Sequence, residues 1–78
     1  MKPIVTEKAV MMIESQNILT FKLDKNQTKP QIKKEIEELF EIKVEKVKTL
    51  IRGNQKYAYV KLNKKFLAID IATKLGII

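Results

Sequence analysis

The chain has 78 residues, of which 45% are hydrophobic and 32% are charged, so we expect one domain over residues 1–78. It contains neither cysteine nor histidine, which excludes disulfides and removes the commonest metal ligand and general base. Apolar runs are too short to span a membrane, and residues 1–9 lack the apolar stretch of a signal peptide. The composition predicts a small non-enzymatic domain without cofactor or metal.

The net charge of +7 is concentrated in the second half of the chain. Residues 1–41 carry seven lysines and seven acids, whereas residues 42–78 carry nine basic residues and two acids. Eight of those nine basic residues fall within residues 42–65. A one-sided excess of this kind favours a polyanion-binding surface, although lysines also coat inert surface strands.

Strand and helix patterns alternate over the first 23 residues. Residues 3–6 are typical of an edge strand, and Thr6 is the expected N-cap of a helix over residues 7–15. Ala9, Val10 and Ile13 supply the buried face of that helix. Residues 17–23 alternate with the period of a strand, which places Leu19, Phe21 and Leu23 on one side and Ile18, Thr20 and Lys22 on the other.

The clearest helix begins after Thr28. Thr28 and Gln31 match a capping box, and Pro30 falls in the first turn, where its missing N–H costs nothing. The expected apolar stripe follows at helical spacing and consists of Ile32, Ile36, Leu39 and Phe40.

A β-hairpin is predicted around Gly53-Asn54, after a slip in phase before Val47 that indicates a connection or bulge. A two-residue turn pairs Arg52 with Gln55, Leu50 with Tyr57 and Lys48 with Tyr59. The inward side chains are then Val47, Thr49, Ala58, Val60 and Leu62. The outward side chains are Lys48, Leu50, Arg52, Tyr57, Tyr59 and Lys61. Lys56 departs from this pattern near the tip.

A last helix is expected over residues 66–75, with Asn63 as its N-cap and Gly76 as its C-terminal cap. Its expected inner side consists of Ala68, Ile69, Ala72 and Leu75. The order β-α-β-α-β-β-α predicts an α+β sandwich with an antiparallel sheet, similar to a ferredoxin-like plait that lacks its final strand.

The sequence does not match the arrangements of catalytic residues that enzymes use. Glu37, Glu38 and Glu41 are expected on the solvated face of a charged helix, whereas acid–base catalysis needs a shielded pair. Acylphosphatases share the plait and use one Arg and one Asn. Here Arg52 and Asn54 lie at a hairpin tip instead of in a cradle at the start of a helix.

The outward face of the hairpin is the strongest candidate site. Lys48, Arg52, Lys56 and Lys61 are expected to surround Tyr57 and Tyr59, and aromatic rings among cations can meet bases and phosphates. Alternatively, the tyrosines lie under a helix or are ordinary cross-strand partners. The chain lacks the aromatic-rich signature of the classical RNA-recognition sheet, so contact with the shape and phosphates of folded RNA is favoured.

Met11 and Met12 admit two interpretations. Methionines can form a soft docking patch for partner proteins, or they can fill the core.

Several segments also resemble family twenty-three of the large-subunit ribosomal proteins, which lies at the exit of the polypeptide tunnel. The matching segments cover residues 3–62 in order: Pro3–Ala9, Asn17–Phe21, Thr28-Lys29, Ile32-Lys33, Glu38–Phe40 with Val44, Val47 and Thr49, and Lys56–Leu62. The ending Asp70–Ala72 with Leu75-Gly76 resembles the archaeal branch.

The resemblance implies a cytoplasmic component of the large ribosomal subunit that is a monomer when free. Its implied partners are large-subunit rRNA, ribosomal protein family twenty-nine and nascent-chain factors such as the signal recognition particle, which would dock at Glu7. The rRNA contacts implied or expected are Lys2, Pro3, Thr6, Lys8, Lys48, Thr49, Arg52, Asn54, Lys56, Tyr57, Tyr59 and Lys61. Bacterial members carry a long basic hairpin loop that reaches into the tunnel. Here that loop is only Gly53-Asn54, so a tunnel-lining role is not expected.

Two other classes of function remain open at this point. One is a general, chromatin-like nucleic-acid-binding protein that uses the same basic hairpin. The other is a protein-binding adaptor whose interface is the tyrosine face, and its binding would be insensitive to salt.

Overall fold

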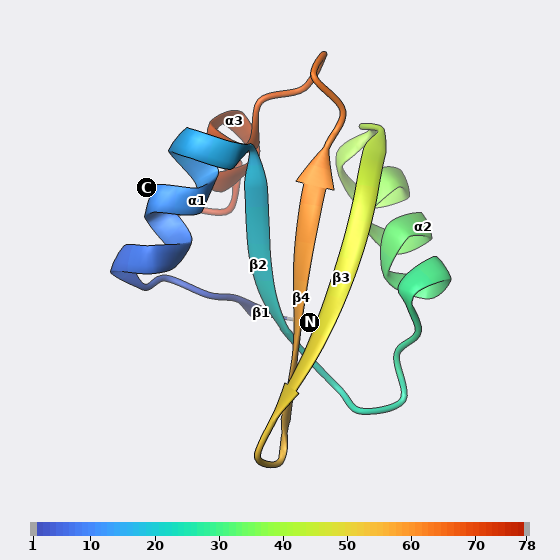
Figure 1. The fold of residues 1–78 in the computed structure, drawn as a ribbon. Coiled ribbons are helices and arrows are strands. Elements are labelled where there is room, and N and C mark those ends of the chain that lie inside the picture. Colours follow the sequence, from blue (N-terminus) through green and yellow to red (C-terminus); the bar gives the residue numbers. More distant parts are fainter. Residues whose placement is uncertain (1, 78) are drawn as a thin grey trace.

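The computed structural model describes residues 2–77 and confirms the predicted order of elements (Figure 1). The elements are β1 (Lys2–Pro3), α1 (Glu7–Gln16), β2 (Ile18–Leu23), α2 (Lys29–Phe40), β3 (Val44–Arg52), β4 (Gln55–Leu62) and α3 (Ala68–Lys74). Strand β1 begins one residue earlier than the predicted strand and is shorter than it. Helix α3 begins two residues later than the predicted last helix.

The four strands form one sheet in the order β1-β2-β4-β3, and every neighbouring pair is antiparallel. The run β2-α2-β3-β4-α3 follows a ferredoxin-like plait without its final strand. The short strand β1 pairs with β2 and therefore occupies the sheet edge beside it. The α+β class and the antiparallel sheet predicted from the sequence are thus confirmed.

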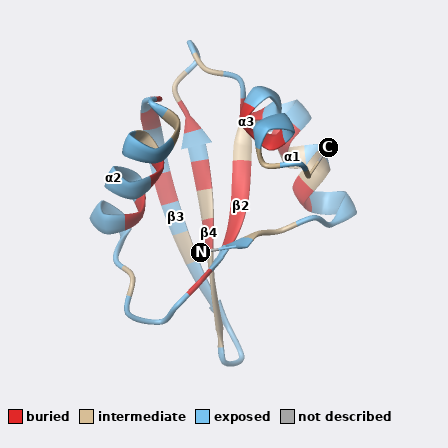
Figure 2. Ribbon diagram, turned by 180° about the vertical axis from the view of Figure 1, so that it is seen from behind, coloured by how far each residue is buried: buried red, intermediate tan, exposed pale blue. Residues whose placement is uncertain are grey.

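Helices α2 and α3 pack on one face of the sheet, while α1 lies along the β2 edge (Figures 1 and 2). The core lies between that face and the two helices, and it also includes Ile13 from α1. Most of the side chains that the sheet contributes were predicted to point inward: Leu19, Phe21, Leu23, Val47, Ala58, Val60 and Leu62. Val44 of β3 joins them in the core and was not among those predicted. The other face of the sheet carries neither α2 nor α3, and we call it the open face.

Local sequence signals fix the helix ends. The Thr6 hydroxyl accepts a hydrogen bond from the Ala9 N–H at 3.1 Å and caps α1. Thr28 and Gln31 form the predicted capping box at the start of α2. Gly76, at a φ of +74°, ends α3 as predicted, because its N–H and that of Ile77 bond back to the last turn.

Three predictions about side-chain placement on the helices were wrong. Leu39 is 64% exposed. On another side of α2, the Glu37 carboxylate accepts a hydrogen bond from the Val44 N–H of β3. Ile69 is 37% exposed, and Ile71 takes its place in the core.

The third error concerns the start of the last helix. Asn63 does not cap it: the Asn63 Oδ1 accepts from the Lys65 N–H in the preceding turn. Leu67 occupies the N-cap position of α3 and makes no side-chain capping bond.

The hairpin register follows the prediction. Arg52 pairs with Gln55, Leu50 with Tyr57 and Lys48 with Tyr59. The expected phase slip is a register shift between Val44 and Lys46, which leaves Glu45 as the extra residue of a bulge. Gly53 supplies the positive φ that the turn needs, at +61°.

Candidate nucleic-acid interface

The open face is organised in cross-strand rows centred on β4. One row joins Thr20, Tyr59 and Lys48, and the next joins Lys22, Tyr57 and Leu50. Directly paired residues in antiparallel strands project to the same side of the sheet. Each tyrosine therefore has a lysine as its direct neighbour on one of the two adjoining strands.

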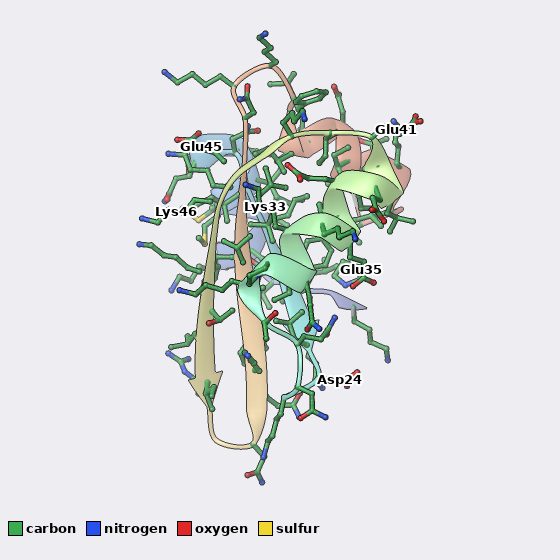
Figure 3. All side chains as sticks on the ribbon, turned by 90° about the vertical axis from the view of Figure 1, so that its right-hand side faces the viewer. Asp24, Lys33, Glu35, Glu41, Glu45 and Lys46 are labelled. Carbon is green, nitrogen blue, oxygen red and sulfur yellow. The ribbon has the colours of Figure 1, made fainter. Side chains whose placement is uncertain are left out.

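Basic side chains surround the tyrosines on this face. We define the cationic face as the exposed side chains of Lys2, Lys22, Lys46, Lys48, Arg52 and Lys61. Figure 3 shows Lys46 projecting away from α2, whereas Glu35 and Glu41 lie on the helical side. The sheet thus separates most basic side chains of the hairpin from the acids of α2, as a polyanion-binding surface requires.

Tyr57 and Tyr59 are both half-buried. Neither tyrosine lies under α2 or α3, since both point to the open face, and α1 borders them from the side through Ala9 and Met12. The rings are therefore packed at one side while remaining partly accessible. This answers the question that the sequence left open, namely whether a helix covers the tyrosines.

Two hairpin residues that were predicted to contact RNA, Thr49 and Lys56, lie on the helix-covered side of the sheet. Thr49 pairs with Ala58 on the helix-covered side. The Lys56 Nζ donates a hydrogen bond of 2.6 Å to the Gln27 carbonyl, which ties the hairpin to the loop before α2. The expectation that Lys56 surrounds the tyrosines was wrong, because it alternates with Tyr57 and Gln55 along β4. Asn54 is exposed at the tip.

The N-terminal residues predicted to contact RNA are split between several positions. Lys2 pairs with Lys22 on the open face, and Pro3 pairs with Phe21 on the other. Thr6 and Lys8 line a pocket beside the tyrosines, although the Thr6 hydroxyl is already used as a cap. Glu7 is exposed in the first turn of α1.

Other kinds of site find little support in residues 2–77. No group of three or more potential metal ligands occurs among them, and none of their helices is long and apolar enough to cross a membrane. Glu37, one of the clustered carboxylates, is half-buried and accepts a structural hydrogen bond of 2.8 Å from the Val44 N–H.

Sequence reasoning missed several residues beside the tyrosines. Thr20, Lys22 and Ile4 come from the N-terminal third of the chain, and Met12 comes from α1. Alternation in the second strand did assign Thr20 and Lys22 to the side away from Leu19. What the sequence lacked was the neighbour relation between β2 and β4, which joins them to Tyr59 and Tyr57.

Comparison with known proteins agrees with the resemblance seen in the sequence. The family profile described as "Ribosomal protein L23" matches residues 1–67. The chain is also similar to the large ribosomal subunit protein uL23 of Pyrobaculum aerophilum, an archaeon. The two are 49% identical over 77 residues, which cover 96% of this chain and 94% of the relative.

The family match and the archaeal relative place the chain among the small structural, non-enzymatic proteins of the large ribosomal subunit. The chain belongs to the ribosomal protein L23 family. It is therefore a component of the translating ribosome in the cytoplasm, and the predicted archaeal type agrees with its similarity to the archaeal relative.

Proposed function

We propose that the cationic face binds large-subunit rRNA at the exit of the polypeptide tunnel, and that α1 helps to form a docking site for nascent-chain factors. The observation that carries the proposal is the gathering of six exposed cations around two half-exposed tyrosines on the one sheet face that α2 and α3 leave open. Family membership supports the ribosomal partner.

The mechanism is electrostatic and non-catalytic. Lysine and arginine side chains neutralise RNA phosphates and release condensed counterions, which gives affinity that falls steeply with salt. If the cationic face and Lys8 together meet ~5–7 phosphates, affinity falls as roughly the fourth to sixth power of salt concentration. The packed helices on the other face hold the sheet rigid, so little ordering accompanies binding.

The docking role is assigned to the outer side of α1. Glu7 and Met11 lie one helical turn apart, and both are exposed, with Met11 at 62%. Val5, just before the helix, is also exposed. An exposed methionine beside a carboxylate fits the docking interpretation and not the core-filling one for Met11. The proposed partners on this side are the signal recognition particle and ribosomal protein family twenty-nine.

A titration with two RNAs tests the rRNA proposal. The ligands are the tunnel-exit domain of large-subunit rRNA and a random duplex of the same length, each at two salt concentrations. The test variant is Lys48→Glu/Arg52→Glu, and the matched control is Lys34→Glu/Lys74→Glu on the helical side. Each double variant lowers the net charge from +7 to +3. Thermal unfolding checks that both remain folded.

Selective binding to the rRNA fragment that is lost only in the open-face variant supports the proposal. Equal affinity for both RNAs would instead indicate a general nucleic-acid-binding protein. An equal loss in both variants would show that net charge alone, and not this face, determines binding.

A further inference from the structure

A pocket opens beside the tyrosines, between the open face and the N-terminal half of α1. Its volume is about 330 Å³, at the low end of the ~300–1,000 Å³ typical of small-molecule sites. Tyr57, Tyr59 and Leu50 line it from the hairpin, and Ala9 and Met12 line it from α1. The pocket is thus large enough for a single planar group and is walled mainly by apolar and aromatic atoms.

The charged residues of the pocket come from two separate elements. Arg52 lies near the hairpin tip and Lys8 lies in the first turn of α1, and both are exposed. Among the described residues, none that lines this pocket is acidic. A ligand that carries negative charge outside the pocket and a flat, uncharged group inside it would match both features.

Thr20 adds an unsatisfied polar group. Its side chain lines the pocket, the residue is only 8% exposed, and its Oγ1 has no hydrogen-bond partner within residues 2–77. A buried hydroxyl without a partner is unfavourable, so such groups in folded proteins are usually satisfied by water or a ligand. The Thr20 hydroxyl can both donate and accept a hydrogen bond, as the edge of a nucleobase requires.

We propose that this pocket binds one unpaired base of the RNA that lies on the cationic face. The base stacks against the Tyr59 ring, its edge bonds to the Thr20 hydroxyl, and its flanking phosphates meet Arg52 and Lys8. This inference rests on the proposed function and adds a base contact to the phosphate contacts. It also gives the two tyrosines a role, although the face lacks the aromatic-rich signature of the classical RNA-recognition sheet.

Binding of short oligonucleotides tests the pocket directly. The probes are an adenosine RNA hexamer and an abasic hexamer with the same number of phosphates, each titrated into the full chain. The chain has two tyrosines and no tryptophan, so its intrinsic fluorescence comes from Tyr57 and Tyr59 alone. Stacking of one base is worth ~1–3 kcal/mol. We therefore expect binding roughly 5–150-fold tighter for the hexamer with bases, together with quenching of tyrosine emission after correction for absorbance.

Two variants separate a binding role from a structural one. Tyr59→Leu removes the stacking surface, so we expect it to abolish the preference for the hexamer with bases over the abasic hexamer. Thr20→Val removes only the hydroxyl at constant shape, which leaves stability unchanged or raised. We expect Thr20→Val to weaken hexamer binding by about 3–10-fold.

Equal affinity for the two hexamers, or unchanged affinity in both variants, would overturn the base-binding proposal. If the rRNA fragment still bound selectively through Lys48 and Arg52 in that case, the proposed function would stand without the pocket. Quenching by an apolar peptide and not by the RNA hexamer would assign the pocket to a protein ligand and likewise overturn the proposal.

Discussion

The Asn17 side chain holds the start of α3 in place, with its Oδ1 accepting a hydrogen bond of 2.6 Å from the Ala68 N–H. Its Nδ2 donates to the Phe66 carbonyl at 2.8 Å. Asn17 also ends α1 in the left-handed conformation, at a φ of 59°. One residue therefore ends the first helix and supplies, from 51 positions away, the cap that α3 lacks locally.

Substitutions at Asn17 are expected to destabilise the domain in a graded way. Asn17→Gly keeps the left-handed backbone but loses the cap, which costs about 1–2 kcal/mol of unfolding free energy. Asn17→Ala adds about 1 kcal/mol more, because alanine is strained at positive φ. Urea denaturation measures both values. Wild-type stability in Asn17→Gly would show that the two hydrogen bonds contribute nothing.

Shortening a side chain to alanine is expected to lower the unfolding free energy much more on the buried face of α2 than on its exposed face. Ile36 is fully buried, whereas Leu39 is 64% exposed. Ile36→Ala should therefore cost about 2–5 kcal/mol, while Leu39→Ala, as a surface substitution, should stay within about 0.5 kcal/mol. Chemical denaturation of the two variants under identical conditions provides the comparison. A loss at Leu39 equal to that at Ile36 would contradict the observed burial.

The strands and the hairpin register could be predicted because they depend on local signals. Alternation in residues 17–23 and the Gly53-Asn54 turn were sufficient to place most inward side chains of these strands, although not Val44. The wrong placements of Leu39 and Asn63 involve contacts between segments that local patterns do not reveal. The Glu37 carboxylate near the end of α2 bonds to the Val44 N–H of β3, and Asn17 caps α3 from a distant part of the chain.

The candidate site was only half predictable for the same reason. The hairpin alone identified Tyr57, Tyr59, Lys48, Arg52 and Lys61 as one face, and the structure confirms that placement. Thr20 and Met12 could not be added from the sequence, because only the strand order and the position of α1 bring them beside the tyrosines.

Lys56 provides a test of its corrected position. Since its Nζ bonds to the Gln27 carbonyl, Lys56→Met should lower the unfolding free energy by about 1 kcal/mol, as expected for one lost hydrogen bond. RNA affinity should change less than in Lys48→Met, which removes the same charge from the open face. Chemical denaturation of the two variants measures their unfolding free energies, and RNA titrations measure their affinities. A larger loss of RNA affinity in Lys56→Met than in Lys48→Met would show that Lys56 contacts the RNA after all.

The salt dependence of binding should report how many side chains of the cationic face contact RNA phosphates. Each phosphate contact contributes ~0.7–0.9 to the slope of log affinity against log salt. Lys48→Gln, Arg52→Gln and Lys61→Gln should therefore each lower the slope by roughly that amount. Lys34→Gln on α2 removes the same charge from the helical side and should leave the slope unchanged, because a side chain distant from the RNA releases no counterion. Titrations of the rRNA fragment at four or more salt concentrations give the slopes. If Lys34→Gln lowered the slope as much as Lys48→Gln, the RNA would have to contact both sides of the sheet, and the open face would lose its assignment as the binding surface.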